Sequence, residues 1–400
     1  MKIKVLWIID NKFRELYGLD TIIKYNFARG VKIFLCHKAN VRRSIKLFNP
    51  EVIIIPNLWE TSGYQFAKLA KIKKIKVILY HSEGLEYSDS YLNIKYPLER
   101  LNEVDKIFLW SSLEENYFIK NNLSEKIVLA GSPKYSSFKR IENKEQKSNK
   151  LNILIITSNR YLTSKIDSNI IKSIMMRSLN DLDAGGVSSS QFMKFEVDYL
   201  FLISQIIHLL SNDGHRVSIK VHPMESEKMY QEAFGNSMIH NKPHIGNAIR
   251  SNDIIINSLS STSVDALKLG VPVISIINFF DIKQSTPRLF EYLPSKLGIK
   301  PKNLLDLKDI LSNNKINNIN NMINKQDLLD VEELAPSLDS KKILFEEIKK
   351  MNCKSKPINF FHIFEYMLSE LNIYFRDRRD SYFRWYSLKD TKYMKYFDRL

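Results

Sequence analysis

Short runs of consecutive apolar residues recur along the chain, and this feature most limits the folds open to it. Continuous rather than alternating hydrophobicity indicates strands that are covered on both faces. Amphipathic stretches between such runs supply the covering helices, so the pattern predicts a parallel sheet flanked by helices. The first series of runs is KVLWII, EVIIIP, KVILY, KIFLW and KIVLAG, with a helical segment around 64–71.

A similar second series follows a polar run, KRIENKEQKSNK at 139–150, which is the expected linker. It consists of NILIITS, a helix over about 195–210, RVSIKVHP, DIIIN, a helix near 264–269 and PVISII. We therefore predict an α/β protein with two Rossmann-like domains that face each other across a cleft, with ligands at the carboxyl ends of the strands. The predicted parts are a first domain at 1–138, the linker at 139–150, a second domain at 151–355 and C-terminal helices at 356–400.

The length and composition of the chain agree with this division into two domains and limit the possible classes of function. Four hundred residues with 44% hydrophobic content suffice for two domains with separate cores. The net charge of +16 is compatible with nucleic acid, an anionic membrane or phosphate-bearing ligands, but the lysines are spread along the whole chain. Cys36 and Cys353 lie far apart without a metal-type spacing, which favours a reducing compartment, the cytoplasm, and predicts no metal site.

The sequence contains no predicted membrane span, because no segment reaches roughly 18 consecutive apolar residues. The last part, 356–400, interleaves aromatic and basic residues. Such a tail can pack back on the first domain or lie on a membrane interface. We favour packing, because large aromatic side chains mostly serve cores and interfaces. Peripheral contact with the cytoplasmic face of an inner membrane is the alternative.

The first candidate for chemistry is the His222–Pro223 pair at the end of the run RVSIKV. Proline has no N–H to donate to a ladder, so the strand ends there and the histidine is left at the carboxyl edge of the sheet. An imidazole at that edge can donate a hydrogen bond to a phosphate and offset its charge. The alternative is a strand-end histidine that only caps a loop.

The second candidate is the hydroxyl-rich loop between DIIIN and the helix near 264–269. Thr262 and Asp265 have the spacing of a capping box, and the N–H groups at a helix N-terminus attract anions. Ordinary capping needs only one of these hydroxyls, so the sequence favours a phosphate site. The serines of this loop are Ser258, Ser260, Ser261 and Ser263.

Two further polar loops follow strands. In the first domain HSEGLE, at 81–86, provides an acidic glycine turn in which Glu83 can act as a general base or orient an acceptor hydroxyl. A solvated polar loop is the alternative. In the second domain TSNR, at 157–160, is expected to line the nucleotide site. The additional acceptor-side candidates are His81, Ser82, Gly84 and Glu86, and the additional donor-side candidates are Ser158, Asn159 and Arg160.

These segments carry a family resemblance. VHPME resembles the HP motif, and HSEG is similar to the acid-acid-glycine motif, of bacterial sialyltransferases and the related Kdo transferases, which use CMP-activated donors. NSLSSTSVDALKLGVPVIS resembles their serine-rich donor motif. The resemblance implies a GT-B glycosyltransferase in which His222, Ser260 and Ser261 contact the CMP phosphate and Glu83 lies near the acceptor hydroxyl. The first acidic position of the motif is Ser82 here, which leaves Glu83 and Glu86 as alternative bases.

The expected function is transfer of a Kdo-like or sialic-acid-like sugar from a CMP-activated co-substrate to a surface polysaccharide or lipopolysaccharide, without a cofactor or metal. The Asp-x-Asp of DLDAGG, at 181–186, does not follow a strand and is interpreted as a polar loop. Three alternatives remain: a CDP-glycerol-type glycerophosphotransferase, a sugar-nucleotide epimerase on the same layout, and a basic nucleic-acid-binding protein.

Overall fold

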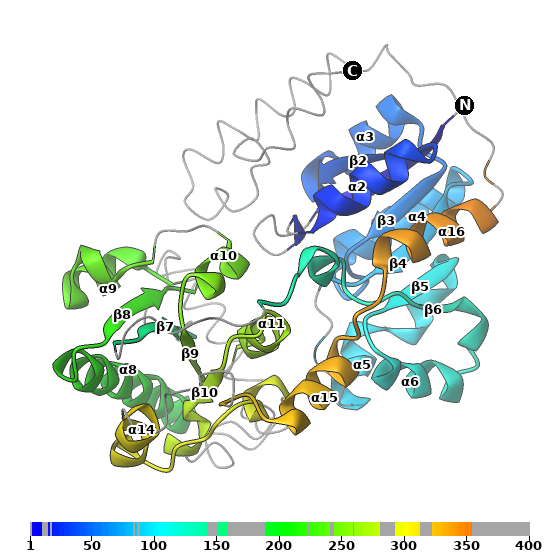
Figure 1. Cartoon of the computed structure of the whole chain (residues 1–400). Helices are drawn as coiled ribbons and strands as arrows, with labels where there is room; N and C mark the ends of the chain where they lie inside the picture. Colours follow the sequence, from blue (N-terminus) through cyan, green and yellow to red (C-terminus); the bar gives the residue numbers. More distant parts are fainter. Residues whose placement is uncertain are drawn as a thin grey trace. The chain divides into compact units, whose positions relative to one another are not determined.

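The chain forms two compact units, here called unit 1 and unit 2 (Figure 1). Unit 1 comprises Met1–Phe138 with Glu332–Leu400, and unit 2 comprises Lys139–Val331. Each is built on a parallel sheet flanked by helices, which confirms the predicted α/β class. The structure, a computed structural model, describes residues 2–9, 15–16, 18–82, 85, 89–141, 150–158, 189–222, 225–240, 244–258, 260–280, 293–312, 322–351 and 353.

Unit 1 contains a parallel sheet of six strands in the order β2-β1-β3-β4-β5-β6. All five predicted runs form strands: four are buried almost throughout, whereas β6, at the edge of the sheet, is half-buried. Strand β2 was not predicted, because a lysine at its second position interrupts the run VKIFLCH. The strands are β1 (Ile3–Ile9), β2 (Val31–His37), β3 (Val52–Ile55), β4 (Lys76–Tyr80), β5 (Lys106–Leu109) and β6 (Ile127–Leu129).

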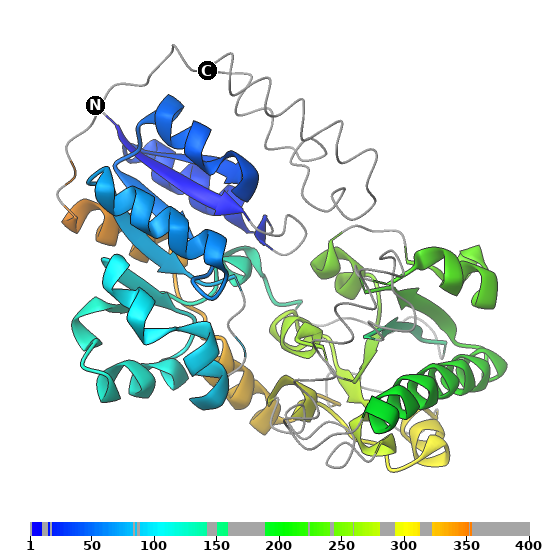
Figure 2. The same ribbon diagram turned by 180° about the vertical axis from the view of Figure 1, so that it is seen from behind.

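Helices cover both faces of this sheet. Figures 1 and 2, seen from opposite sides, show α2 and α16 over one face and α4 over the other. Alternate strand residues and the apolar sides of α3 to α6 form one continuous core. The predicted helix at 64–71 is α4. The helices are α2 (Leu19–Ala28), α3 (Val41–Phe48), α4 (Thr61–Ile72), α5 (Asp89–Lys95), α6 (Glu115–Lys120) and α16 (Ser340–Lys350).

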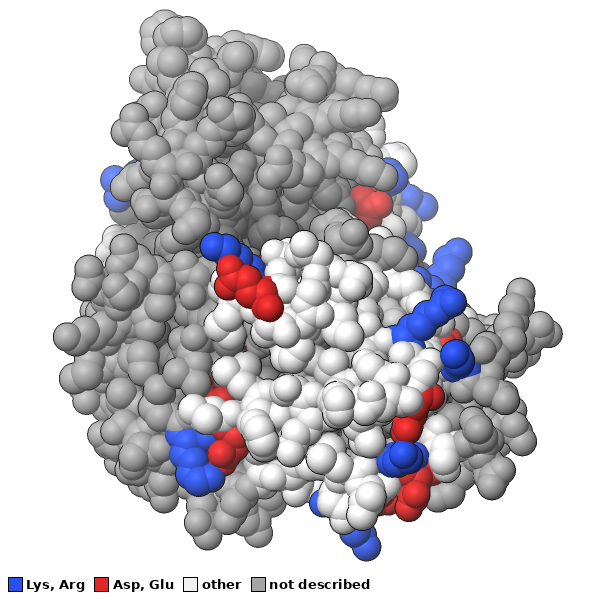
Figure 3. All heavy atoms as spheres, turned by 90° about the vertical axis from the view of Figure 1, so that its left-hand side faces the viewer, with Lys and Arg blue, Asp and Glu red and all other residues white. Residues whose placement is uncertain are grey.

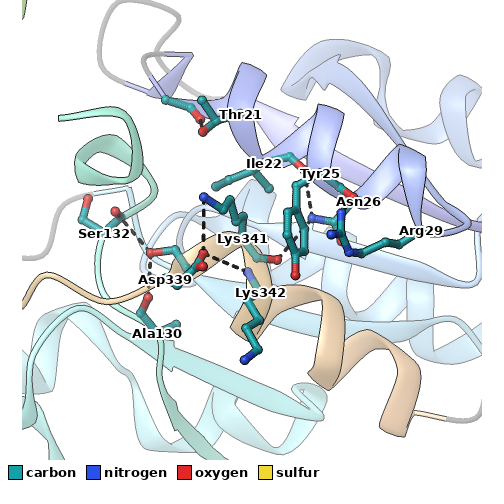
Figure 4. Close-up of polar contacts among 12 residues, drawn as sticks. Thr21, Ile22, Tyr25, Asn26, Arg29, Ala130, Ser132, Asp339, Lys341 and Lys342 are labelled. Carbon is teal, nitrogen blue, oxygen red and sulfur yellow. Dashed lines mark hydrogen bonds and ion pairs between the residues drawn. The ribbon is translucent and has the colours of Figure 1, made fainter. Parts of the chain in front are cut away.

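The chain returns to unit 1 at Glu332, near the end of α15 (Lys325–Leu334). The buried Ser340 hydroxyl donates to Ala130 O over 2.7 Å, and Asn26 Nδ2 of α2 donates to Lys341 O over 3.4 Å (Figure 4). These contacts seat α16 against α2. Residues 332–353 therefore belong to unit 1, whereas the sequence analysis assigned 151–355 to the second domain. The predicted C-terminal helices at 356–400 lie outside the described residues.

Unit 2 contains a parallel sheet of four strands in the order β10-β9-β7-β8. All four strands were predicted, as were the long helix α8 (Ser189–Asn212) and the short helix α11 (Thr262–Lys268). Apolar residues of α8 and α14 pack against the sheet in one core, and α10 and α11 contact each other. The remaining elements are β7 (Asn152–Ile156), β8 (Arg216–Lys220), β9 (Ile254–Asn257), β10 (Val273–Ser275), α9 (Glu227–Phe234), α10 (Ile245–Arg250) and α14 (Leu304–Leu311).

The predicted linker begins inside unit 2. Ile141 N donates to Leu269 O over 2.9 Å, and Lys139 O accepts from Arg250 Nη2 over 2.9 Å. The first three residues of the run therefore pack on α10 and on the end of α11. Residues 142–149 lie outside the described part of the chain.

The described surface mixes charges of both signs. Figure 3 shows basic and acidic side chains next to each other on one face, with an uncharged area between them. Neighbouring pairs on helices include Lys194–Asp198 and Lys228–Glu232. On this face the described residues therefore form no basic patch of the kind that nucleic-acid binding requires. Within the described residues, every helix is too short or too polar to cross a bilayer.

Candidate functional site

The carboxyl ends of β7, β8 and β9 define the candidate site of unit 2. The chain leaves β7 for β8 on one side and later places β9 on the other side of β7. Connections diverge at such a point, and open α/β sheets bind ligands in the crevice that results. The switch point lies between β7 and β9, so the residues that follow these two strands are the first candidates for ligand contact.

Two serines lie side by side at the switch point. Ser158 Oγ, after β7, is 2.9 Å from Ser258 Oγ, after β9. Ser258 is buried and Ser158 is half-buried. A pair of hydroxyls can donate one hydrogen bond to the other and a second one outward, to an oxygen of a ligand.

His222 lies on the next strand end, two residues after β8. It is half-buried, and its backbone N–H donates to Thr157 Oγ1 over 2.9 Å. Thr157 immediately precedes Ser158. The structure therefore brings the predicted histidine and the predicted serines Ser158 and Ser258 to one edge of one sheet, on three adjacent strands.

Sequence reasoning missed the residue that joins this edge together. The Glu225 carboxylate is fully buried and accepts a hydrogen bond from the Thr157 hydroxyl. Its backbone N–H donates to His222 O over 2.8 Å. The sequence signal for Glu225 is an acidic residue three positions after a histidine that ends a strand. Acidic residues are common at the start of helices, so this signal did not distinguish Glu225 from a helix-starting residue.

Two buried tyrosines are near enough to Glu225 for its charge to affect their pKa values. Burial, followed by the charge of Glu225, raises the pKa of Tyr199 to about 12. The same two causes, in the same order, raise the pKa of Tyr230. Hydrogen bonding by the neighbouring Ser158 and Ser258 hydroxyls lowers the pKa of Tyr199, but by less than burial and Glu225 raise it. The pKa of Tyr199 thus responds to both the serine pair and Glu225, and both phenols stay neutral at physiological pH.

The serine loop before α11 differs from the predicted capping box. Its N-cap residue is Ser261, and the Thr262 N–H donates to Ser260 Oγ over 3.3 Å, so Thr262 does not cap the helix with Asp265. Ser260 Oγ also lies 2.9 Å from Thr262 Oγ1. The Ser263 hydroxyl donates to Pro294 O over 2.6 Å and to Ser260 O over 3.3 Å. Ser260 and Ser261 are the half-buried hydroxyls of this loop.

In unit 1 the candidate residues follow β4. His81 is buried between aromatic rings, 5.4 Å from Trp59 and 5.4 Å from Tyr96 between ring centroids. Its backbone O accepts from Trp110 Nε1 over 2.9 Å. Ser82 is half-buried at the same edge. A small cavity of about 30 Å³ opens there, and Trp7, Tyr80, His81, Ser82, Trp110 and Lys134 are among the residues that line it.

A buried ion pair lies next to this edge of unit 1 and bonds to residues that contact His81. Lys95 and Glu114 are both fully buried and form an ion pair. Tyr96 OH donates to Glu114 Oε1 over 2.9 Å, and Trp110 N donates to Glu114 Oε2 over 3.2 Å. The pair therefore fixes Tyr96 and Trp110, which both contact His81.

Several predicted site residues lie outside the described residues: Glu83, Gly84, Glu86, Asn159, Arg160, Pro223 and the DLDAGG segment. Among the residues that the structure describes, no group of three or more His, Cys, Asp or Glu side chains could hold a metal ion.

Comparisons with known proteins indicate the fold. No protein-family model matches the chain, and no curated protein matches its sequence. UDP-GlcNAc 2-epimerase from Methanocaldococcus jannaschii aligns with a TM-score of 0.51 at 12% identity, over 88% of this chain and 100% of that chain. Wall teichoic acid polymerase TagF soaked with CDPG aligns with a TM-score of 0.51 at 12% identity, over 88% of this chain and 89% of that chain. These likenesses support two Rossmann-like domains of GT-B type.

Proposed function

We propose that the chain is a glycosyltransferase that moves a Kdo-like or sialic-acid-like sugar from a CMP-activated donor onto a growing surface glycan. The observation that carries this proposal is the row of polar groups on three adjacent strand ends in unit 2. Ser158 and Ser258 stand at the switch point where α/β sheets bind ligands, and His222 follows the adjacent strand β8. A phosphate is the ligand that such hydroxyls and an imidazole fit best.

The donor phosphate has to accept negative charge when the bond to the sugar breaks. Preorganised hydrogen-bond donors at that position lower the barrier, because they stabilise charge that develops in the transition state. We assign this role to His222 together with Ser260 and Ser261, whose half-buried side chains stand at the edge of unit 2. On the donor side we add Pro223, Ser158, Asn159, Arg160, Ser258 and Thr262.

The acceptor side is proposed to be the loop after β4. Glu83, or alternatively Glu86, would take the proton of the acceptor hydroxyl, with His81, Ser82 and Gly84 shaping the loop. The buried His81 and the half-buried Ser82 begin this loop at the carboxyl edge of the unit 1 sheet. We further propose that transfer proceeds without a metal, and that the tail at 356–400 contacts either unit 1 or the membrane that carries the acceptor.

A glycerophosphotransferase with a CDP-glycerol-type donor is the second candidate, and a specific observation favours it. TagF, whose structure was determined after a soak with CDPG, shares the fold over 88% of this chain. Such an enzyme would direct attack at phosphorus rather than at an anomeric carbon. Epimerisation of a sugar nucleotide is the third candidate function, because the chain also shares its fold with UDP-GlcNAc 2-epimerase.

One set of incubations separates the three candidates. The full chain is incubated without acceptor with CMP-sialic acid, CMP-Kdo, CDP-glycerol or UDP-GlcNAc, and nucleotides are separated by chromatography. We expect slow release of CMP from one of the first two donors. Release of CMP from CDP-glycerol would favour the second candidate, and a new sugar nucleotide formed from UDP-GlcNAc would favour the third.

The variant His222→Ala connects the activity to the site. We expect it to reduce CMP release at least about tenfold, since loss of one donor to developing charge typically costs more than that. The matched control is His240→Ala, which removes another histidine of unit 2 whose Nε2 lies 3.2 Å from Ser251 Oγ. Equal loss in both variants would mean that the effect is not specific to the site.

A further inference from the structure

Thr157, His222 and Glu225 close a circuit of hydrogen bonds at the carboxyl edge of unit 2. His222 N–H donates to Thr157 Oγ1, the Thr157 hydroxyl donates to the Glu225 carboxylate, and Glu225 N–H donates back to His222 O. The last contact joins residues three positions apart in the sequence, and the two residues between them lie outside the described residues. Both backbone polar groups of His222 are therefore held by the circuit.

Burial shields this circuit from water. Thr157 and Glu225 are each fully buried. A hydrogen bond to a charged acceptor is stronger than one between neutral groups, and a low dielectric strengthens it further. The Thr157 hydroxyl has one proton, which it donates in a hydrogen bond to the Glu225 carboxylate. Its oxygen lone pairs can therefore accept the hydrogen bond from His222 N–H.

The circuit also connects the two halves of the candidate site. Thr157 immediately precedes Ser158, whose hydroxyl lies 2.9 Å from that of Ser258. Tyr199 donates to Ile156 O over 3.3 Å, at the end of the same strand. Thr157 therefore bonds to His222 and is the neighbour in sequence of one member of the serine pair.

We propose that Thr157 and Glu225 are positioning residues that set His222 against the donor phosphate. They act through the backbone of His222, without touching the ligand themselves. This inference rests on the proposed function, since it takes His222 to be the group that contacts the phosphate. It adds a specific requirement: the hydroxyl at position 157 should contribute to CMP affinity only while the imidazole at position 222 is present.

A double-mutant cycle with CMP as the probe tests this requirement. Calorimetric titration of the full chain compares the wild type with Thr157→Val, His222→Ala and the double variant. We expect Thr157→Val to weaken CMP binding about tenfold, and to have little further effect in the His222→Ala background. An equal loss in both backgrounds would show a general structural effect and overturn the proposal.

Two controls separate positioning from loss of folding. Thr157→Ser keeps the hydroxyl and should restore affinity to within about threefold of the wild type. Ser218→Ala removes a hydroxyl from the middle of β8, where it contacts Ile153 O and Asn252 Oδ1, and should leave CMP affinity unchanged. If Thr157→Val does not fold, Glu225→Met replaces it, because methionine has a similar length and removes both acceptor oxygens. A wild-type affinity in Glu225→Met would then overturn the proposal.

A readout without nucleotide distinguishes failure of this inference from failure of the proposed function. The imidazole signals of His222 are followed by NMR in ¹³C-histidine-labelled protein and identified by their loss in His222→Ala. We expect Thr157→Val to shift them and Thr157→Ser to restore them. Unchanged signals would refute the positioning role, whereas shifted signals in a protein that binds no CMP would refute only the proposed ligand.

Discussion

Ser158 and Ser258 are separated by one hundred positions in the sequence, yet their hydroxyl oxygens lie 2.9 Å apart at the carboxyl ends of β7 and β9. The parallel pairing of the two strands, with Ile155 opposite Ile256, brings the following loops together. The contact marks the switch point of the unit 2 sheet, where the proposed phosphate site lies.

Ser258→Ala tests the contribution of this pair. The change removes a buried hydroxyl whose half-buried partner Ser158 can turn to water, so we expect the free energy of unfolding to fall by only about 1 kcal/mol. CMP affinity, measured by calorimetry, should fall several-fold. A fall in stability without any change in affinity would mean that the pair is structural only.

The ionisation of Tyr199 predicts a stability change at alkaline pH. Burial and the charge of Glu225 raise its pKa from 10 to about 12 in the folded state. The unfolded chain therefore releases this proton at lower pH than the folded chain does. The contribution of Tyr199 to the free energy of unfolding is complete below pH 10 and is lost as pH rises from 10 to 12. The full effect corresponds to at most roughly 3 kcal/mol.

Urea unfolding of the wild type and of Tyr199→Phe, at several values between pH 9 and pH 12, measures this effect. We expect the stability of the wild type to fall more steeply with pH than that of the variant. Parallel curves would show that Tyr199 ionises normally and that its surroundings are more polar than the structure indicates.

The strands could be predicted from the sequence because the information is local: continuous apolar runs identified β7, β8, β9 and β10 and five strands of unit 1. The circuit could not, since it joins Thr157 to Glu225, 68 positions away, and depends on the register that places Ile156 opposite Lys220. The strand β2 was missed because Lys32 interrupts its run. The segment 340–350 was predicted to belong to the second domain, and only the contacts of Ser340 and Asn26 show that it packs on unit 1.

Removing Lys95 should destabilise unit 1 strongly. Lys95→Met leaves the Glu114 carboxylate buried without its cationic partner, which typically costs about 3–5 kcal/mol. The double variant Lys95→Met with Glu114→Gln removes both charges and should recover most of that loss. Chemical denaturation followed by circular dichroism measures both. A double variant as unstable as the single one would mean that the ion pair itself, rather than the orphaned charge, provides the stability.

Gly298 and Gly235 form a matched pair for a test of backbone requirements in unit 2. Both have φ 88°, a conformation that costs residues with a side chain about 1–2 kcal/mol. A Cβ at Gly298 would lie 2.4 Å from Val273 O, whereas a Cβ at Gly235 would meet nothing within 4 Å. We expect Gly298→Ala to destabilise the protein clearly more than Gly235→Ala in thermal unfolding. Equal effects would indicate that the turn at Gly298 relaxes.

A crystal structure of the full chain soaked with CMP tests the central claim most directly. We expect the phosphate at the carboxyl edge of the unit 2 sheet, with its oxygens about 2.7–3.2 Å from a ring nitrogen of His222 and from at least one hydroxyl of Ser158, Ser258, Ser260 or Ser261. A phosphate bound elsewhere on the chain, or an empty edge at saturating CMP, would contradict the account.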